Sequence, residues 1–240
     1  MTAQGGLHSL PAELRTAVRA EPGHLLVRAD LGQIEPRVLA TVSGDAALAA
    51  AAREPDMYTP VAAALRCDRP TAKVSVLAAM YGQTSGTAGA ALRDMDRTYP
   101  TAMAYLRSAE EAGLHRRDLR TYGGRLLRLA SLPAGEPVGE HVAVSGGFGR
   151  FARNAMVQGA AAELFKAWAV TVRAGLPALR GQIVLCLHDE LLVHVPRESA
   201  DDAARLLVEA LDRTAAWWAA GSGVRFVAEV GIGDSWAAAH

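Results

Sequence analysis

The segment QIVLCLHDELLVHVP, residues 182–196, contains two apolar runs on either side of the polar triplet His188, Asp189 and Glu190. Short aliphatic and β-branched runs broken by polar residues predict a β-hairpin, with Asp189 and Glu190 at its tip. Two carboxylates about 4 Å apart repel by roughly 4 kcal/mol at an effective dielectric constant of ~20, so a compensating cation is expected. An ordinary hairpin with a solvated acidic turn fits this stretch alone equally well.

Composition indicates a globular chain with a sizeable core, arranged as one domain or two closely joined ones. Of its 240 residues half are apolar and 21% are charged, and the formal net charge is zero. No apolar run approaches the ~20 residues of a membrane span, and the N-terminus lacks the pattern of a signal peptide. Cys67 and Cys186 lie in no metal-binding spacing and suggest a reducing compartment. We therefore expect a cytoplasmic protein that does not bind membranes.

A second acidic position follows an apolar run near the N-terminus, in HLLVRADLGQIEPRVLATVSGD, residues 24–45. The run 25–27 predicts a strand that ends at Asp30. A helix is predicted from near Glu35 to Ser43, because Pro36 in a first helical turn sacrifices no hydrogen bond. Asp30 is thus placed at a strand end and Glu35 at a helix start.

Residues 46–112 are rich in alanine and predict mostly helix, with breaks near Pro55, Pro60, 67–70, 82–86 and Pro100. Within the helix predicted over 69–82, four residues recur at every fourth position: Arg69, Lys73, Leu77 and Tyr81. The simplest interpretation is a helix with two surface cations and an apolar face. The cations lie in the first turns, however, where the helix dipole favours an anion.

A long helix is predicted from about residue 150 to 174. Arg150, Asn154 and Gln158 are spaced by four and form one polar stripe of hydrogen-bond donors, although such a stripe is usually only the solvated face. The arginine-rich segment 115–128 is likewise a mild indication of nucleic-acid contact. Four further features are predicted: a loop or small hairpin over 131–149, a capping box formed by Ser199 and Asp202, a helix after it, and a last strand over 224–230.

Together these features match the needs of phosphoryl transfer by two metal ions. Asp30 and Asp189 end predicted strands far apart in the chain, and a helix presenting arginine and lysine lies between them. Carboxylates hold two Mg²⁺ ions about 3.5–4 Å apart in such enzymes, and cations neutralise the remaining phosphate charge.

The same segments resemble the motifs of the family A DNA polymerases, the bacterial DNA polymerase I family. Residues 30–45 resemble motif A (D-Y-S-Q-I-E-L-R), residues 69–82 resemble motif B (R-x-x-x-K-x-x-x-F-x-x-x-Y-G), and LHDELL at 187–192 resembles motif C (V-H-D-E-L). RFARNAMVQGAAAE at 150–163 and EVGIGDSWAAAH at the end are also similar to family segments. The similarity is continuous from about Leu7 to His240, with the motifs in order.

The resemblance implies a role for each matching position. Asp30 and Asp189 would be catalytic and would bind two Mg²⁺ ions, for which Mn²⁺ can substitute, with Glu190 in support. Glu35 would be the steric gate that excludes a ribose 2′-OH. The positions implied to bind the dNTP are Gln33, Glu35, Arg69, Lys73, Leu77 and Tyr81. The positions implied to face primer–template DNA are Arg150, Asn154, Gln158 and His188.

The fold class that the resemblance implies is α+β, with a palm of antiparallel strands and a mostly helical fingers insertion. The expected domains are palm over 1–45, fingers over 46–150 and palm again over 151–240, with thumb and exonuclease domains absent. An upstream thumb or exonuclease region in a longer chain is an expected partner. The resemblance also favours a nucleoid-associated monomer that acts in DNA replication or repair.

The sequence departs from the family pattern at two places. Leu77 replaces an aromatic residue, and base–aromatic stacking contributes roughly 1–3 kcal/mol, so weaker nucleotide binding is expected. Leu31 and Gly32 replace Tyr-Ser beside Asp30.

Two alternatives to an active polymerase remain open. One is a catalytically silent or very weak DNA-binding remnant, or a fragment of a longer polymerase. The other is a metal-dependent nuclease built on the same carboxylates, in which Glu35 and the pair Arg69 and Lys73 would have no purpose.

Overall fold

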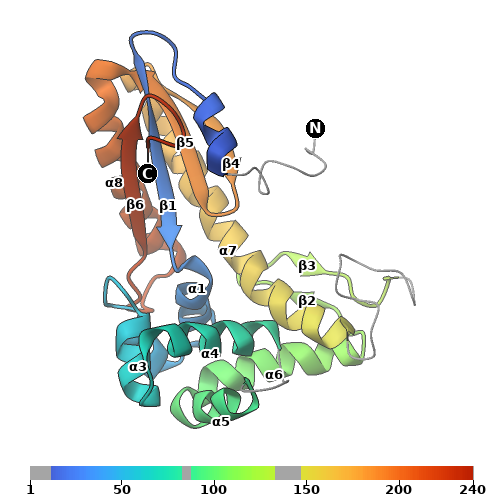
Figure 1. Ribbon diagram of the computed structural model, residues 1–240. Coiled ribbons are helices and arrows are strands. Elements are labelled where there is room, and N and C mark those ends of the chain that lie inside the picture. Colours follow the sequence, from blue (N-terminus) through green and yellow to red (C-terminus); the bar gives the residue numbers. More distant parts are fainter. Residues whose placement is uncertain (1–11, 83–87, 133–146, 240) are drawn as a thin grey trace. The chain divides into compact units, whose positions relative to one another are not determined.

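The computed structural model describes residues 12–82, 88–132 and 147–239, and it is an α+β structure (Figure 1). The chain divides into two compact units. Unit 1 comprises Met1–Ile34, Leu164–Ala220 and Phe226–His240, and unit 2 comprises Glu35–Glu163 and Gly221–Arg225. No helix in the described parts is long and apolar enough to cross a membrane.

Unit 1 contains a four-stranded antiparallel sheet in the order β4-β5-β1-β6. The strands are β1 (His24–Gly32), β4 (Gln182–Leu187), β5 (Glu190–Pro196) and β6 (Val227–Gly233). The inner strand β1 therefore comes from the N-terminal part of the chain, and both of its neighbours, β5 and β6, come from the C-terminal part. This arrangement confirms the predicted antiparallel sheet built from both ends of the sequence.

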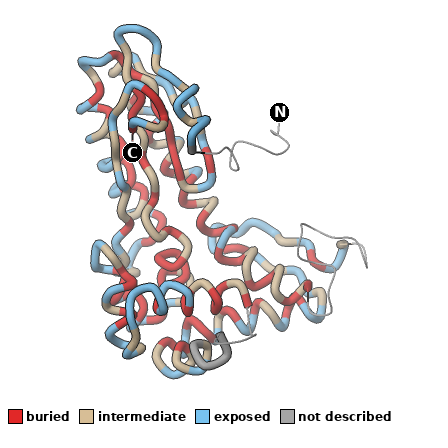
Figure 2. The backbone as a smooth tube through the Cα atoms, viewed as in Figure 1, coloured by how far each residue is buried: buried red, intermediate tan, exposed pale blue. Residues whose placement is uncertain are grey.

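Both faces of the central strands are covered, as the burial colouring shows (Figure 2). Leu26 and Leu192 pack with Trp236 in an apolar cluster on one face. The helix α8 (Ala200–Trp218) contacts β1, β5 and β6, and Trp168 donates a hydrogen bond from Nε1 to the carbonyl of Leu207 on it. Strand β5 is consequently an almost continuous apolar run, as expected of a strand that is buried on two sides.

Unit 2 is mostly helical. Its elements are α1 (Ile34–Ser43), α2 (Ala46–Ala51), α3 (Tyr58–Leu65), α4 (Arg69–Tyr81), α5 (Ala88–Thr98), α6 (Pro100–Leu114), the two short strands β2 (Leu119–Arg120) and β3 (Leu126–Leu127), and the first part of α7 (Gly147–Gly175). The remaining short elements, η1 (Ala12–Ala17), η2 (Leu176–Leu179) and η3 (Arg197–Ser199), are 3-10 turns of unit 1.

Two aspartates begin helices of unit 2 by the usual capping chemistry, in which a carboxylate accepts bonds from free backbone N–H groups. Asp68 accepts a hydrogen bond from the backbone N–H of Thr71 and caps α4. Asp45 is buried and caps two helices: one oxygen accepts from the N–H groups of residues 47 and 48, and the other from those of residues 101 and 102. Asp45 therefore joins α2 to α6.

Arg37 on α1 is fully buried and organises the loops of unit 2. Its guanidinium donates to the carbonyls of Ala52 (2.8 Å), Glu54 (2.9 Å), Pro55 (2.6 Å) and Arg225 (2.6 Å). Burial, together with the neighbouring Arg225, lowers its pKa to about 10, so it still carries its charge at neutral pH. The side chain thus satisfies carbonyls that would otherwise lack partners.

Several local predictions are confirmed by the helices and strands. The hairpin over 182–196, α1, α4 and α7 lie where the patterns placed them, and the last strand is shifted by three residues to β6. The hairpin turn consists of His188 and Asp189, whereas Glu190 is not at the tip but is the first residue of β5 and is buried.

Other local predictions are wrong. Pro60 does not break a helix, because it lies in the first turn of α3. Ser199 precedes α8 but makes no side-chain capping bond, since the 3-10 turn η3 leads into the helix instead.

Two further predictions are not tested by the structure. The arginine-rich segment 115–128 contains the small β2–β3 hairpin, and its contact with nucleic acid stays a prediction. The loop or small hairpin predicted over 131–149 lies mostly outside the described residues.

We predict that replacing Arg37 by methionine destabilises the protein by at least about 3 kcal/mol, because buried carbonyls lose their donors and each costs roughly 1–3 kcal/mol. Urea unfolding monitored by circular dichroism measures the change. Arg173→Met is the matched control, since Arg173 is exposed on α7. Equal stabilities for the two variants would contradict the role given to Arg37.

Candidate active site

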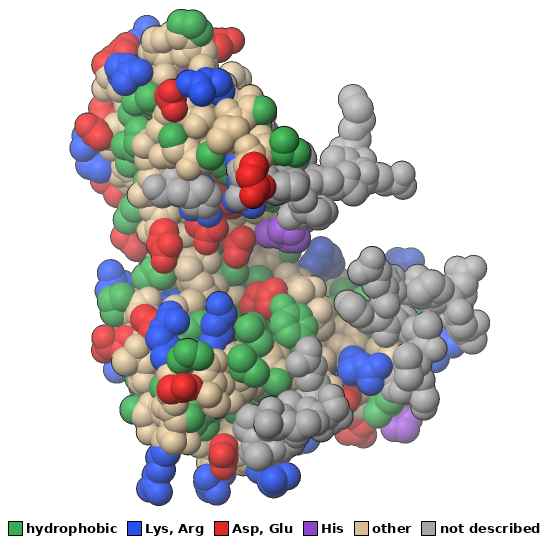
Figure 3. Space-filling model, in the orientation of Figure 1, with side chains coloured by type: hydrophobic (Ala, Val, Ile, Leu, Met, Phe, Trp, Pro, Cys, Tyr) green, Lys and Arg blue, Asp and Glu red, His purple; other side chains and the backbone are tan. Residues whose placement is uncertain are grey.

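Carboxylates from three strands and one turn gather at one end of the sheet in unit 1. The register places Asp30 of β1 directly opposite Glu190 of β5 on one side and Glu229 of β6 on the other. Asp189 lies in the turn before β5, where its carbonyl accepts a hydrogen bond from the N–H of Leu31 (2.9 Å). A space-filling view shows several acidic side chains gathered on one part of the surface of unit 1 (Figure 3).

A cation was expected to compensate Asp189 and Glu190, and Arg28 is a cation that pairs with Glu190 and also with Asp30. Its Nη2 lies 2.8 Å from Asp30 Oδ2, and its Nε lies 2.8 Å from Glu190 Oε2. The other oxygen of Glu190 accepts a hydrogen bond from Nε1 of the buried Trp236. Glu190 is therefore fixed by two partners and almost fully buried, whereas the Asp30 side chain is 29% exposed.

Burial and neighbouring negative charges raise the pKa values of the carboxyl groups at this end of the sheet. Burial, followed by the charge of Asp189, raises the pKa of Asp30 from its usual 3.8 to about 6, and Arg28 only partly offsets this. Burial likewise raises the pKa of Asp189. Oxygen donors in local excess are the ligand set that hard divalent cations such as Mg²⁺ prefer. The residues present therefore fit a Mg²⁺ site.

Sequence reasoning overlooked Glu229. Its charge raises the pKa of Asp30, and it lies exposed on β6 opposite that residue. The alternation in VRFVAEV predicted the strand, but only the cross-strand register shows which residue Glu229 faces.

Two predicted site residues, Gln33 and His188, lie in the connections that follow β1 and β4. Both take left-handed backbone angles, φ 56° and φ 52°.

Three predicted site residues from separate helices meet in unit 2. Glu35 of α1 accepts a hydrogen bond from the hydroxyl of Tyr81 on α4 (2.9 Å) and one from the amide of Gln158 on α7 (3.4 Å). Burial and the adjacent Glu35 raise the pKa of Tyr81 to about 12, so its hydroxyl remains a donor at neutral pH. The side chain of Glu35 is thus held in a defined position.

The remaining predicted residues of α4 lie on its exposed side. Arg69 pairs with Asp56 through two hydrogen bonds (2.7 and 2.9 Å) and lies over the ring of Tyr58. Lys73 is exposed and Leu77 is half-buried. Gly82 ends the helix at φ +66°, where a side chain would be strained and would press against Arg150.

The polar stripe of α7 is half-buried at Arg150 and Asn154 and exposed at Gln158. The Oδ1 atom of Asn154 is shielded from solvent and has no hydrogen-bond partner within the described residues. Its neighbour Arg153 has a structural role instead, because it donates to the carbonyl of Ala79 and pairs with Glu110, both at 2.6 Å. Arg153 is therefore engaged within the fold, whereas the role of the stripe in DNA contact stays a prediction.

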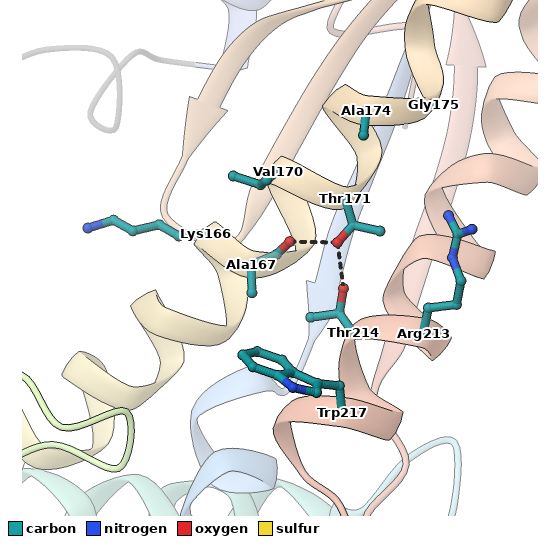
Figure 4. Close-up of a pocket in the computed structure, with 9 residues that line it drawn as sticks. All are labelled: Lys166, Ala167, Val170, Thr171, Ala174, Gly175, Arg213, Thr214 and Trp217. Carbon is teal, nitrogen blue, oxygen red and sulfur yellow. Dashed lines mark hydrogen bonds between the residues drawn. The ribbon is translucent and has the colours of Figure 1, made fainter.

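A groove of about 800 Å³ lies between α7 and α8 in unit 1, away from these carboxylates (Figure 4). Trp217 is 75% exposed and lies across one end of the groove, and Thr214 and Thr171 are hydrogen-bonded to each other in its wall. As far as the described residues show, its lining contains no acidic side chain. The groove therefore offers no carboxylate ligand for a cation.

Comparison with known proteins identifies the family. A model of DNA polymerase family A matches residues 8–238, so the chain belongs to that family. DNA polymerase I of Chloroflexus aurantiacus is 34% identical over 218 residues, which is 81% of this chain and 22% of the relative. The thermostable DNA polymerase I of Thermus aquaticus is 30% identical over 251 residues, which is 96% of this chain and 29% of the relative. The family predicted from the motifs is confirmed.

A solved structure has the same fold. The POL domain of Pol1 from M. smegmatis, in complex with DNA primer-template and dNTP, superposes with a TM-score of 0.80 at 25% sequence identity. The match covers 99% of this chain and 45% of that chain. The chain thus spans less than a third of the two curated relatives and under half of the solved chain.

We predict that Asp30→Asn stabilises the metal-free protein at pH 7.5 by about 1–3 kcal/mol, because the folded state no longer holds an ionised carboxylate of raised pKa. The folded pKa exceeds the unfolded value, so the destabilisation by Asp30 is full above pH ~6. It disappears as the pH falls towards ~4.

Urea unfolding in the presence of a chelator at pH 7.5 and pH 4 measures this effect. The advantage of Asp30→Asn should shrink at the lower pH, while the exposed control Asp212→Asn should show no such change. A variant that is less stable than the parent at pH 7.5 would contradict the electrostatic account.

Proposed function

We propose that this chain is the palm and fingers part of a template-directed DNA polymerase, with unit 1 as the palm and unit 2 as the fingers. The observation that carries the proposal is the gathering of Asp30, Asp189 and Glu190 at one end of the sheet in a chain of this family. The domain limits of 1–45, 46–150 and 151–240 stay a prediction.

The carboxylates of Asp30 and Asp189 would hold two Mg²⁺ ions. When bound, these ions lower the pKa of the attacking primer 3′-OH and stabilise the leaving oxygen. Arg28 positions the carboxylates of Asp30 and Glu190 in advance, so that they need not reorganise when substrate binds. His188 would contact the primer end from the turn beside Asp189.

The residues of α4 would bind the incoming nucleotide. Lys73 is exposed, and Arg69 would exchange Asp56 for the triphosphate, because a guanidinium forms strong paired bonds with either anion. Leu77 cannot stack on a base as an aromatic ring does, which favours weak nucleotide binding. Gln33 and Tyr81 would complete the nucleotide contacts.

The stripe on α7 would contact the DNA minor groove. Every base pair presents an N3 or O2 acceptor there, so Arg150 and Gln158 can check pair geometry without reading sequence. Asn154 lies on the same stripe and would add its side-chain amide N–H as a further donor. Such sequence-independent contacts fit an enzyme that must copy any template.

Primer extension tests this proposal. The full chain is incubated with a recessed primer–template, Mg²⁺ and dNTPs at low salt, beside the variants Asp189→Asn and Asp212→Asn. We expect extension by the parent and by Asp212→Asn, and a loss of at least about a hundredfold in Asp189→Asn. DNA binding by the parent without extension would overturn the proposal and support a silent DNA-binding module.

We further predict that Glu35→Ala admits ribonucleotides, because removing the side chain opens the space that a 2′-OH would occupy. The ratio of deoxynucleotide to ribonucleotide incorporation should fall by roughly tenfold or more. Glu35→Gln is the matched control, since it keeps the bulk and removes the charge, and it should still exclude ribonucleotides. If Glu35→Ala discriminates like the parent, Glu35 is not the gate.

A further inference from the structure

A second group of potential metal ligands lies in unit 1, at the end of the β1–β5 pair opposite the carboxylates. Glu21, His24 and His194 each offer a ligand atom, and the three atoms lie within 4.8 Å of one another. His24 begins β1, six residues before Asp30, so the two ends of the strand are separated by about 20 Å. The group is therefore distinct from the candidate active site.

Local backbone structure brings the three side chains together. Glu21 and His24 are the first and last residues of a turn closed by a bond from the N–H of His24 to the carbonyl of Glu21 (2.9 Å). Pro22 and Gly23 occupy its centre, and Gly23 adopts φ +82°, as the third position of a type II turn requires. The carbonyl of Gly23 also accepts from the N–H of Arg197 (3.0 Å), which ties the turn to the end of β5.

The sheet register supplies the third ligand. Leu26 pairs with His194 and His24 pairs with Pro196, so the two histidines are diagonal neighbours on one face of the sheet. Their rings stack with centroids 4.5 Å apart. Both histidines are half-buried and Glu21 is exposed, so a cation can reach them from solvent.

The hydrogen bonds show which ring nitrogen of each histidine carries the lone pair that a metal would need. The carbonyl of Pro22 can only accept, so its 3.3 Å contact assigns the proton of His24 to Nδ1 and the lone pair to Nε2. A histidine that donates its second ring N–H to a backbone carbonyl is the usual arrangement of a metal ligand. In His194, Nε2 accepts a bond of 3.3 Å from the N–H of Glu21, so this nitrogen also carries a lone pair.

We propose that Glu21, His24 and His194 bind a divalent transition-metal cation of the Zn²⁺ type. Two imidazoles and a carboxylate form a ligand set that Zn²⁺ takes, with a fourth position left for water. Ligand atoms around tetrahedral Zn²⁺ are about 3.3 Å apart, so the three side chains must rotate towards one another when the ion binds. Nε2 of His194 then gives up its hydrogen bond from the N–H of Glu21 and coordinates the ion instead. The bound ion links strand β5 to the turn that precedes β1.

Zn²⁺ titration of the full chain tests the proposal. Calorimetry is performed in a large excess of Mg²⁺, which occupies carboxylate sites but competes poorly for imidazole. We expect one bound Zn²⁺ in the parent, and an affinity at least roughly tenfold lower in His24→Gln and in His194→Gln. His115→Gln, which alters an exposed histidine elsewhere, is the matched control and should bind as the parent does.

Two further measurements separate this site from the candidate active site and from misfolding. Asp189→Asn should retain the Zn²⁺ affinity of the parent. Co²⁺ should give the visible absorption of a nitrogen-ligated ion in the parent and in Asp189→Asn, but not in the His24 and His194 variants. The circular dichroism of the metal-free variants reports whether they are folded.

The proposal is overturned if folded His24→Gln and His194→Gln bind Zn²⁺ like the parent. It is also overturned if the parent binds no Zn²⁺ in excess Mg²⁺. Neither result bears on primer extension, which tests the proposed polymerase activity separately.

Discussion

The carboxylates at one end of the sheet are held together by backbone pairing against their own repulsion. The antiparallel register of β1 with β5 and β6 fixes Asp30 between Glu190 and Glu229, and like charges directly opposite one another destabilise a sheet. Arg28 and Trp236 hold Glu190, and burial together with the remaining excess of negative charge raises the pKa of Asp30 to about 6. The repulsion between these carboxylates lowers the stability of the fold, and burial of apolar side chains in the core of the sheet offsets this loss.

In unit 2, as in the sheet of unit 1, a rigid framework holds the predicted site residues in fixed positions. Buried Arg37 and Asp45 satisfy backbone groups of several loops and helix ends, and these bonds tie α1 to the neighbouring loops and α2 to α6. On that framework Glu35 meets Tyr81 and Gln158. Membership of DNA polymerase family A gives both groups of residues a common proposed purpose, the binding and joining of nucleotides.

Local patterns predicted the elements well because they depend on near neighbours in the chain. The hairpin around Asp189, the helix from Arg69 and the long helix carrying Asn154 were all expected from the order of apolar and polar residues. Contacts between distant residues could not be predicted in this way. The burial of Glu190 against Trp236 and the position of Glu229 opposite Asp30 depend on the register of the whole sheet. The four-carbonyl environment of Arg37 depends likewise on loops that the sequence pattern does not position.

The central claim is that the carboxylates of Asp30 and Asp189 form a site for divalent cations. Diffraction from crystals of the full chain soaked in Mn²⁺, measured for anomalous scattering, tests this claim most directly, because the anomalous signal distinguishes manganese from water and from the light atoms of the protein. The account predicts anomalous peaks within about 2.5 Å of carboxylate oxygens of Asp30 and Asp189. Saturating Mn²⁺ that leaves both carboxylates without a peak would contradict it.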